Sequence, residues 1–150
     1  MRNYVRINIE ITYVIRYNIH MLHRRTKTTV SMINYHFVFC PRYRRKIFDI
    51  PGVERRFKEL TAAVCRENEF RILAMECHHD HVHIFLNVLP QYSPSEVMKI
   101  VKGATSRELR DEFPRLSKMP SLWTRSFYCS TAGEVSSETI RKYIETQKTR

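Results

Sequence analysis

The chain has no apolar run long enough to cross a membrane, although 43% of its residues are hydrophobic. Its one isoleucine-rich region, near the N-terminus, is interrupted by Arg6, Glu10 and Arg16, whereas a spanning helix needs about 20 predominantly apolar residues. The same region has no continuous apolar core and no small-residue cleavage site, both of which mark a secretory signal peptide. We therefore expect neither a membrane protein nor a secreted one.

Acidic residues are scarce relative to basic ones. The 150 residues include 15 Asp and Glu against 26 Lys and Arg, which gives a net charge of +11 and a pI near 9.8. An excess of this size indicates a polyanionic partner, either nucleic acid or an anionic membrane surface. Because no membrane segment is predicted, nucleic acid is the leading candidate. The length corresponds to one domain with a genuine hydrophobic core.

The cysteines lack the close spacing of a zinc site or a redox pair. Cys40, Cys65, Cys77 and Cys129 are far apart, each lies in an apolar stretch, and there is no CxxC pair. Such cysteines are typical of reduced, buried thiols in a cytosolic protein.

From residue 28 onwards, hydrophobic patterning predicts alternating strands and helices. Strands are predicted over 30–40, 70–77, 81–89 and 122–132, and helices over 51–68, 93–110 and from Ser136 or Ser137 towards the C-terminus. Ser93 and Glu96 form a predicted capping box at the start of the second helix. The order β-α-β-β-α-β plus a last helix predicts an α+β, ferredoxin-like or RRM-like fold, with an antiparallel sheet. Residues 1–27 are interpreted as an N-terminal extension, and residues 28–150 as the functional domain.

The stretch "HHDHVHIFL", residues 78–86, contains four of the seven histidines within six positions. His81 and His83 flank Val82 in a predicted strand, so both imidazoles should project from one face while Val82 enters the core. Two imidazoles on one rigid element make half of a metal site. The pair alone is weak support, because histidines with purely structural partners are common.

The last predicted helix carries two polar residues on its apolar side. Its stripe runs through Ile140, Tyr143, Ile144 and Gln147, and Tyr143 and Gln147 are four apart, so they lie on one side of the helix. A structural interpretation is a tyrosine with its hydroxyl at the rim and a glutamine near the helix end. That interpretation does not explain why a His pair, a Tyr-x-x-x-Gln helix and a basic chain occur together.

Two motifs, "DHVHIFL" and "YIETQ", together resemble the single-tyrosine HUH transposases, small insertion-sequence enzymes that cut and join single-stranded DNA. In the name, H is histidine and U is a bulky apolar residue. The segments "NYHFVFCPRYRRKIF", "KGATSREL" and "LWTRSFYCSTAG" resemble further parts of these enzymes. The five segments follow the family's order over residues 28–147.

The resemblance implies a DNA transposase acting on insertion-sequence ends. It assigns Tyr143 as the nucleophile that forms a 5′-phosphotyrosine, and His81, His83 and Gln147 as ligands of Mg²⁺ or Mn²⁺. It also implies recognition of an imperfect DNA hairpin, and a homodimer in which the tyrosine helix of each subunit completes the partner's site. The location that it implies is the prokaryotic cytoplasm.

The chemistry of these residue types is consistent with such a reaction. A bound cation polarises an anionic phosphodiester and orients it for in-line attack, and imidazoles with an amide oxygen are harder ligands than thiolates. A tyrosine hydroxyl has a pKa of about 10 in model peptides, so it needs activation at neutral pH. Asp80 is interpreted either as a hydrogen-bond partner of a metal-binding imidazole or as a simple turn residue.

Basic residues form a cluster directly after the first predicted strand. Guanidinium groups alternate with an aromatic ring there, as on surfaces that follow a DNA backbone and stack on bases. The second predicted helix contributes Lys102 as a weaker DNA-binding candidate, because a charged helix face is often only solvated. The cluster consists of Arg42, Tyr43, Arg44, Arg45 and Lys46.

Three other functions remain open. One is a catalytically silent or domesticated relative that binds DNA or RNA hairpins without cleaving them. Another is a sheet-based RNA-binding protein, whose glycine- and aromatic-rich strand signature is missing here, although Phe37 and Phe39 leave some room for it. A two-histidine phosphodiesterase fits poorly, because the chain has no second His-x-Thr or His-x-Ser motif.

Overall fold

The computed structural model describes residues 23–131, so the predicted last helix with Tyr143 and Gln147 lies outside the described residues. The strands are β1 (Arg24–Arg25), β2 (Val30–Ser31), β3 (Ile33–Phe39), β4 (Arg71–Cys77), β5 (Val82–Val88) and β6 (Tyr128–Thr131). The α-helices are α2 (Val53–Glu67), α3 (Pro94–Glu112) and α4 (Pro114–Ser117), and the short 3-10 helices are η2 (Arg42–Arg44) and η3 (Ile47–Asp49).

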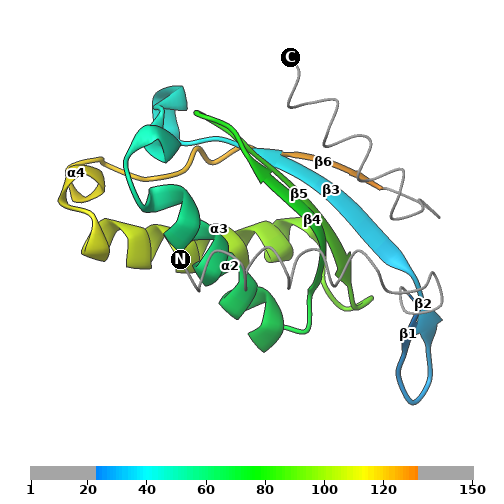
Figure 1. Ribbon diagram of the computed structural model, residues 1–150. Helices are drawn as coiled ribbons and strands as arrows, with labels where there is room; N and C mark the ends of the chain where they lie inside the picture. The colour runs from blue at the N-terminus through cyan, green and yellow to red at the C-terminus, as the bar shows by residue number, and fades with distance from the viewer. Residues whose placement is uncertain (1–22, 132–150) are drawn as a thin grey trace.

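One antiparallel sheet forms the centre of the molecule, with the strand order β4-β5-β3-β6. Helices α2 and α3 cover one face of this sheet, and the small β1-β2 hairpin lies beyond the start of β3 (Figure 1). The chain order β3-α2-β4-β5-α3-β6 confirms the predicted ferredoxin-like α+β arrangement. Within residues 23–131, no helix combines the length and the apolarity of a membrane span.

Strand β5 shows most clearly how the sequence pattern determines the two faces of the sheet. Every second residue from Val82 to Val88 is completely buried in the hydrophobic core, so Val82 enters the core as predicted. The intervening residues, His83, Phe85 and Asn87, project from the opposite face because side chains alternate along a strand. The face opposite the helices therefore carries the polar and aromatic groups of this strand.

Local signals account for the starts of both long helices. At the start of α3, the Ser93 hydroxyl accepts a hydrogen bond from the Glu96 amide at 3.2 Å, and the Glu96 carboxylate accepts one from the Ser93 amide at 2.7 Å. The predicted capping box is thereby confirmed. Helix α2 follows Gly52, whose φ of 87° lies in the left-handed region that a residue with a side chain rarely adopts.

The fourth predicted strand, over 122–132, is shorter in the structure, because only Tyr128–Thr131 pairs as β6. Before it, the chain forms a loop that packs on α3. The Trp123 indole is buried there and donates a hydrogen bond to Thr105 at 3.1 Å. The prediction of a long strand was wrong because the first half of the segment has only an isolated β-bridge, between Trp123 and Pro41, and its contacts with α3 hold it as a loop.

Arg24 links the start of the described chain to the sheet. Its side chain is buried and donates hydrogen bonds to the Glu69 carbonyl at 2.8 Å and to the Asn87 side chain at 3.3 Å. Asn87 in turn donates to Asn34 on β3 at 2.8 Å. Arg24 lies in the segment interpreted as an extension, and its contacts fall on residues of the ferredoxin-like fold. The boundary at residue 27 remains a prediction.

The four cysteines are free thiols, as expected from their spacing. Cys65 and Cys77 are buried, and burial raises the pKa of the Cys65 thiol to about 12, so neither a thiolate nor a metal ligand is favoured there. Cys40 and Cys129 are only half-buried, which corrects the expectation that all four are buried.

Two buried threonines provide a matched stability test. The Thr61 hydroxyl has no hydrogen-bond partner within residues 23–131, whereas the Thr105 hydroxyl donates to the Val101 carbonyl and accepts from Trp123. We expect Thr61→Val to raise the free energy of unfolding by about 1 kcal/mol, because an unsatisfied buried polar group disappears. Thr105→Val should lower it by ~1–3 kcal/mol, because the indole donor is orphaned. Urea unfolding of both variants measures the difference, and equal effects would contradict these assignments.

Candidate active site

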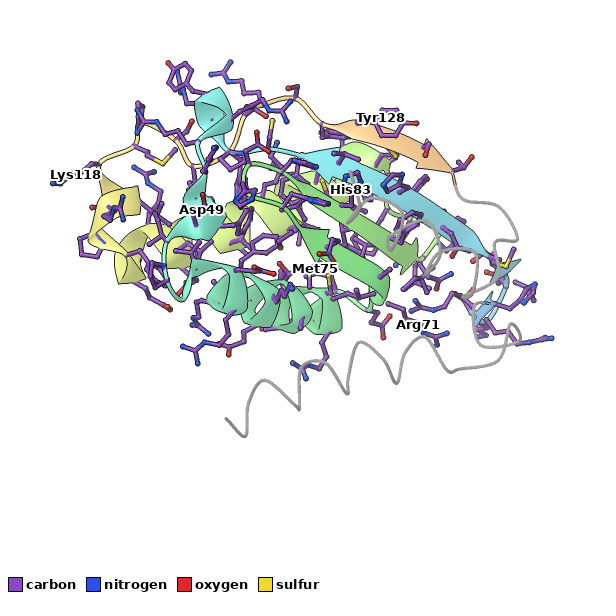
Figure 2. The ribbon with its side chains drawn as sticks, turned by 45° about the horizontal axis from the view of Figure 1, so that its top comes forward. Asp49, Arg71, Met75, His83, Lys118 and Tyr128 are labelled. Carbon is purple, nitrogen blue, oxygen red and sulfur yellow. The ribbon has the colours of Figure 1, made fainter. Side chains whose placement is uncertain are left out.

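The turn between β4 and β5 brings three imidazoles together. The His78 amide donates a hydrogen bond to the His81 carbonyl at 2.9 Å, which closes the turn. His81 directly precedes β5, and His83, on β5, lies opposite Val38 of β3 in the strand register. Figure 2 shows His83 over the centre of the sheet, where the two central strands run side by side. The predicted His81–His83 pair thus lies at the start of β5, a central strand of the sheet.

His81 is oriented by a chain of hydrogen bonds that runs from Arg44 in the η2 loop through Asp80 to the imidazole. Its Nδ1 lies 2.8 Å from the Asp80 carboxylate, which also accepts a hydrogen bond from Arg44 Nε at 3.1 Å. The hydrogen bonds from His81 and from Arg44 lower the pKa of Asp80 to about 2, so this carboxylate is ionised at neutral pH. Of the two interpretations of Asp80, the structure supports a partner of the His81 imidazole, placed within the turn.

His83 is oriented by a second histidine that the sequence reasoning did not single out. Its Nδ1 lies 3.1 Å from Nε2 of His36, and the His36 ring stacks on Phe85 with 4.2 Å between centroids. Burial, and then the neighbouring His36, lower the pKa of His83 to about 4, so its ring is neutral at neutral pH. The signal for His36 was its alternation with Phe37 on β3, which places it on the same face as His83.

His78 is the third imidazole of this group. Its ring is stacked on that of His81, with a centroid distance of 4.5 Å and an interplanar angle of 10°. One potential ligand nitrogen from each of His78, His81 and His83 lies within 4.8 Å of the others. Sequence reasoning placed His78 in the turn and gave it no role.

An open pocket of about 500 Å³ lies in front of the histidine pair. Its lining includes Arg44, His81 and His83, together with Phe127 and Tyr128 from the approach to β6 and from β6 itself. Tyr128 is 57% exposed and projects from the strand next to β3 (Figure 2). Cationic, imidazole and aromatic groups therefore surround one space that could admit a phosphodiester and an adjacent base.

The predicted basic cluster forms the tight η2 turn and the residues after it. Tyr43 and Arg44 have φ angles of 58° and 49°, so two successive non-glycine residues adopt the left-handed conformation. The Arg42 guanidinium lies 5.1 Å from the centroid of the Tyr43 ring, which is 70% exposed. Arg45 and Lys46 are exposed as well. The cluster thus presents an aromatic ring and cations to solvent, and it directs Arg44 towards Asp80.

Lys102 has a different environment from this cluster. Its ammonium donates hydrogen bonds to the carbonyls of Thr124 at 2.5 Å and of Arg125 and Ser126 at 3.4 Å each. Burial lowers the pKa of Lys102. These contacts hold the loop before β6, and the DNA contact of Lys102 stays a prediction.

The hydrogen bonds that Asp80 accepts from His81 and Arg44 should make the stability of the fold depend on pH. Because the pKa of Asp80 is lowered from 3.8 to about 2, ionised Asp80 stabilises the fold above pH 3.8, and this contribution is lost as the pH falls through about 2. Arg44→Ala should raise the Asp80 pKa and reduce this contribution, because one of its two hydrogen bonds disappears. Carboxyl-carbon NMR titration of the metal-free protein measures the pKa. Arg45→Ala is the control. An unchanged Asp80 pKa in Arg44→Ala would show that Arg44 does not form this hydrogen bond with Asp80.

Comparison with known sequences identifies relatives along most of the chain. The family model described as "Transposase IS200 like" matches residues 29–147. The ISDra2 transposase TnpA of Deinococcus radiodurans is 30% identical over 121 residues, which cover 79% of this chain and 86% of that protein. The transposase for insertion sequence element IS200 of Salmonella typhimurium is 35% identical over 117 residues, which cover 75% of each protein.

Solved structures show the same fold. A crystal structure of a transposase from Deinococcus radiodurans has a TM-score of 0.67 and 28% identity, and the match covers 83% of this chain and 97% of that one. A tyrosine transposase bound to a REP hairpin has a TM-score of 0.55 and covers 81% of this chain and 68% of that one. At 13% identity, this second match shows a likeness in fold alone. From the sequence match over residues 29–147 and the relatives of 30% and 35% identity, the chain belongs to the IS200-like transposase family.

Proposed function

We propose that this transposase cleaves and rejoins single-stranded DNA at insertion-sequence ends through a covalent 5′-phosphotyrosine on Tyr143. The observation that carries the proposal is the pair of imidazoles beside the pocket. Asp80 engages Nδ1 of His81, and His36 engages Nδ1 of His83. Each ring is therefore fixed in orientation through one nitrogen and would coordinate a cation through the other. A hairpin-binding protein without catalysis would not require such an arrangement.

The donor set fits a divalent cation. Metal-binding histidines usually have their second nitrogen engaged by a protein partner, as His81 and His83 do here. With Gln147 as a third ligand, these residues would hold Mg²⁺ or Mn²⁺ and leave positions for phosphate and water. A cation bound there would polarise the phosphodiester and help to lower the pKa of the attacking hydroxyl.

Tyr143 supplies the covalent step in this proposal. Its hydroxyl loses a proton and attacks the phosphorus, the bond to the 3′-oxygen breaks, and the 3′-hydroxyl leaves with a proton. The phosphotyrosine conserves the broken phosphodiester, so the reverse attack by another 3′-hydroxyl rejoins DNA without an energy source. We infer the roles of Tyr143 and Gln147 from the family motif alone, because both lie outside the described residues.

The substrate in this proposal is single-stranded DNA with hairpin ends. The exposed Tyr43 ring and the cations around it suit base stacking and phosphate contacts. A solved structure of the same fold is that of a transposase bound to a REP hairpin, which is consistent with this choice. We further propose a homodimer in which the tyrosine helix of each subunit completes the partner's site, as the family resemblance implies.

Covalent trapping tests the reaction. With a labelled single strand that carries a hairpin, we expect a protein–DNA adduct on a denaturing gel, dependent on a divalent cation and absent in Tyr143→Phe. His81→Ala should abolish the adduct and retain hairpin binding, because it alters the metal site and leaves the basic cluster intact. Duplex DNA of the same sequence serves as the control and should react poorly. An adduct that persists in Tyr143→Phe would place the nucleophile elsewhere, and hairpin binding without any adduct would indicate the catalytically silent alternative.

Salt dependence tests the DNA-binding surface. Removing a cation that binds one phosphate should reduce the slope of log affinity against log salt by roughly 0.7 for a single strand. We therefore expect Arg45→Ala with Lys46→Ala to weaken hairpin binding and to flatten this slope. Arg55→Ala with Arg66→Ala is the matched control, because it removes the same charge from exposed positions of α2, on the helical face of the sheet. Equal effects of the two double variants would show that net charge, and not this cluster, directs binding.

A further inference from the structure

The His78 side chain has no role in the proposed reaction, yet its environment is unusual. Its Nε2 atom is buried and has no hydrogen-bond partner within residues 23–131. A buried polar atom without a partner is costly, and such atoms in native structures often indicate a missing ion or water. The atom lies in a group of three imidazoles whose ligand nitrogens are within 4.8 Å of one another.

We propose that His78 is a third imidazole ligand, and that His78, His81 and His83 form a site for a borderline transition-metal ion such as Zn²⁺ or Co²⁺. The inference rests on the proposed function in one respect, namely that His81 and His83 bind the cation of the reaction. It goes beyond that function in adding a ligand from the turn and in selecting the class of metal.

The hydrogen bonds around the cluster point to the same ligand nitrogen on all three rings. Nδ1 of His81 faces Asp80, and Nδ1 of His83 faces His36. Nε2 is therefore the nitrogen through which both rings would coordinate an ion, and Nε2 is the unpartnered atom of His78. Three imidazoles from one turn and one strand thus form a compact donor set that does not require the C-terminal segment.

Closing the cluster around an ion requires only side-chain movement. Zn–N bonds of about 2.0–2.1 Å in a tetrahedral site place the nitrogens roughly 3.3 Å apart. The present separations, up to 4.8 Å, would shorten by rotation of the His78 ring out of its stack on His81. The backbone of the turn need not move, because the hydrogen bond from His78 to His81 is made by main-chain atoms.

The donor chemistry selects the metal. Neutral imidazoles suit Zn²⁺ and neighbouring transition metals, whereas Mg²⁺ prefers oxygen ligands and retains its waters. Three histidines with an open fourth position are also a common ligand set of catalytic zinc sites. A site of this kind would leave a fourth position for a phosphate oxygen.

The adjacent His79 offers a matched control. It lies next to His78 in the same turn, but its ring is exposed and paired with Asp49. It is also absent from the group of imidazoles that could share an ion. Removal of either ring leaves the main-chain hydrogen bond of the turn in place. Both variants should therefore keep the fold of the turn, and only His78→Ala removes a member of the cluster, since His79→Ala removes an exposed contact with Asp49.

The test measures metal binding by the full-length, metal-free protein. Co²⁺ is titrated and followed by its visible absorption, and Zn²⁺ competition then gives the Zn²⁺ affinity. We expect His78→Ala to lower the affinity for both Co²⁺ and Zn²⁺ by at least about tenfold. Loss of a residue that only hydrogen-bonds to a ligand already costs about tenfold or more, and loss of a ligand should cost at least as much. His79→Ala should bind like the wild type, and Gln147→Ala should weaken binding less than His78→Ala. Equal affinity of His78→Ala and His79→Ala would overturn the proposal.

A second measurement on the wild type avoids dependence on any variant. Nitrogen-15 NMR of the histidine rings should show the Nε2 resonance of His78 shifting together with those of His81 and His83 when Zn²⁺ is added. A His78 resonance that stays in place while the other two shift would overturn the proposal. The adduct assay separates the two hypotheses: an adduct that requires His81, with metal affinity independent of His78, refutes only this inference. Metal affinity that depends on His78, in a protein that forms no adduct, refutes only the proposed function.

Discussion

The contact between His36 and His83 across the two central strands is the constraint on which the site depends. It joins β3 to β5 on the face opposite the helices, at 3.1 Å between ring nitrogens, while Val82 on the other face is anchored in the core. A side chain held in this way has little rotational freedom, and its pKa is lowered, so the His83 ring is neutral. A neutral and immobile imidazole is what a metal ligand requires, since the cost of ordering it is met during folding.

The η2 loop extends this order to the edge of the pocket. Two successive residues in the left-handed conformation, Tyr43 and Arg44, each carry a conformational cost of order 1–3 kcal/mol. The turn brings the Arg44 guanidinium to Asp80 and leaves the Tyr43 ring exposed. One strained turn thus has two consequences, because it supports the His81 imidazole on one side and leaves an aromatic ring exposed to solvent on the other.

Several parts of the fold and of the site could be predicted because they depend on local patterns. The alternation in β5 predicted that Val82 enters the core, and the Ser93–Glu96 pair predicted the start of α3. The length of the last strand could not be predicted, because Trp123 and Lys102 form contacts distant in sequence that hold the preceding loop. The environment of Lys102 has the same origin, because its ammonium donates to three carbonyls of that loop, while its DNA contact stays a prediction.

The sequence by itself determined the order of the elements, the basic character of the chain and the placement of two imidazoles on one face of a strand. These properties follow from composition and from the two-residue period of a strand, and both are local. Only the tertiary structure decided which groups surround those imidazoles. His36 comes from 47 positions away and Arg44 approaches Asp80 across 36, and no periodicity within a segment encodes such a meeting. The His78 nitrogen that has no partner within residues 23–131 likewise depends on how the turn closes and on the neighbours that then surround it.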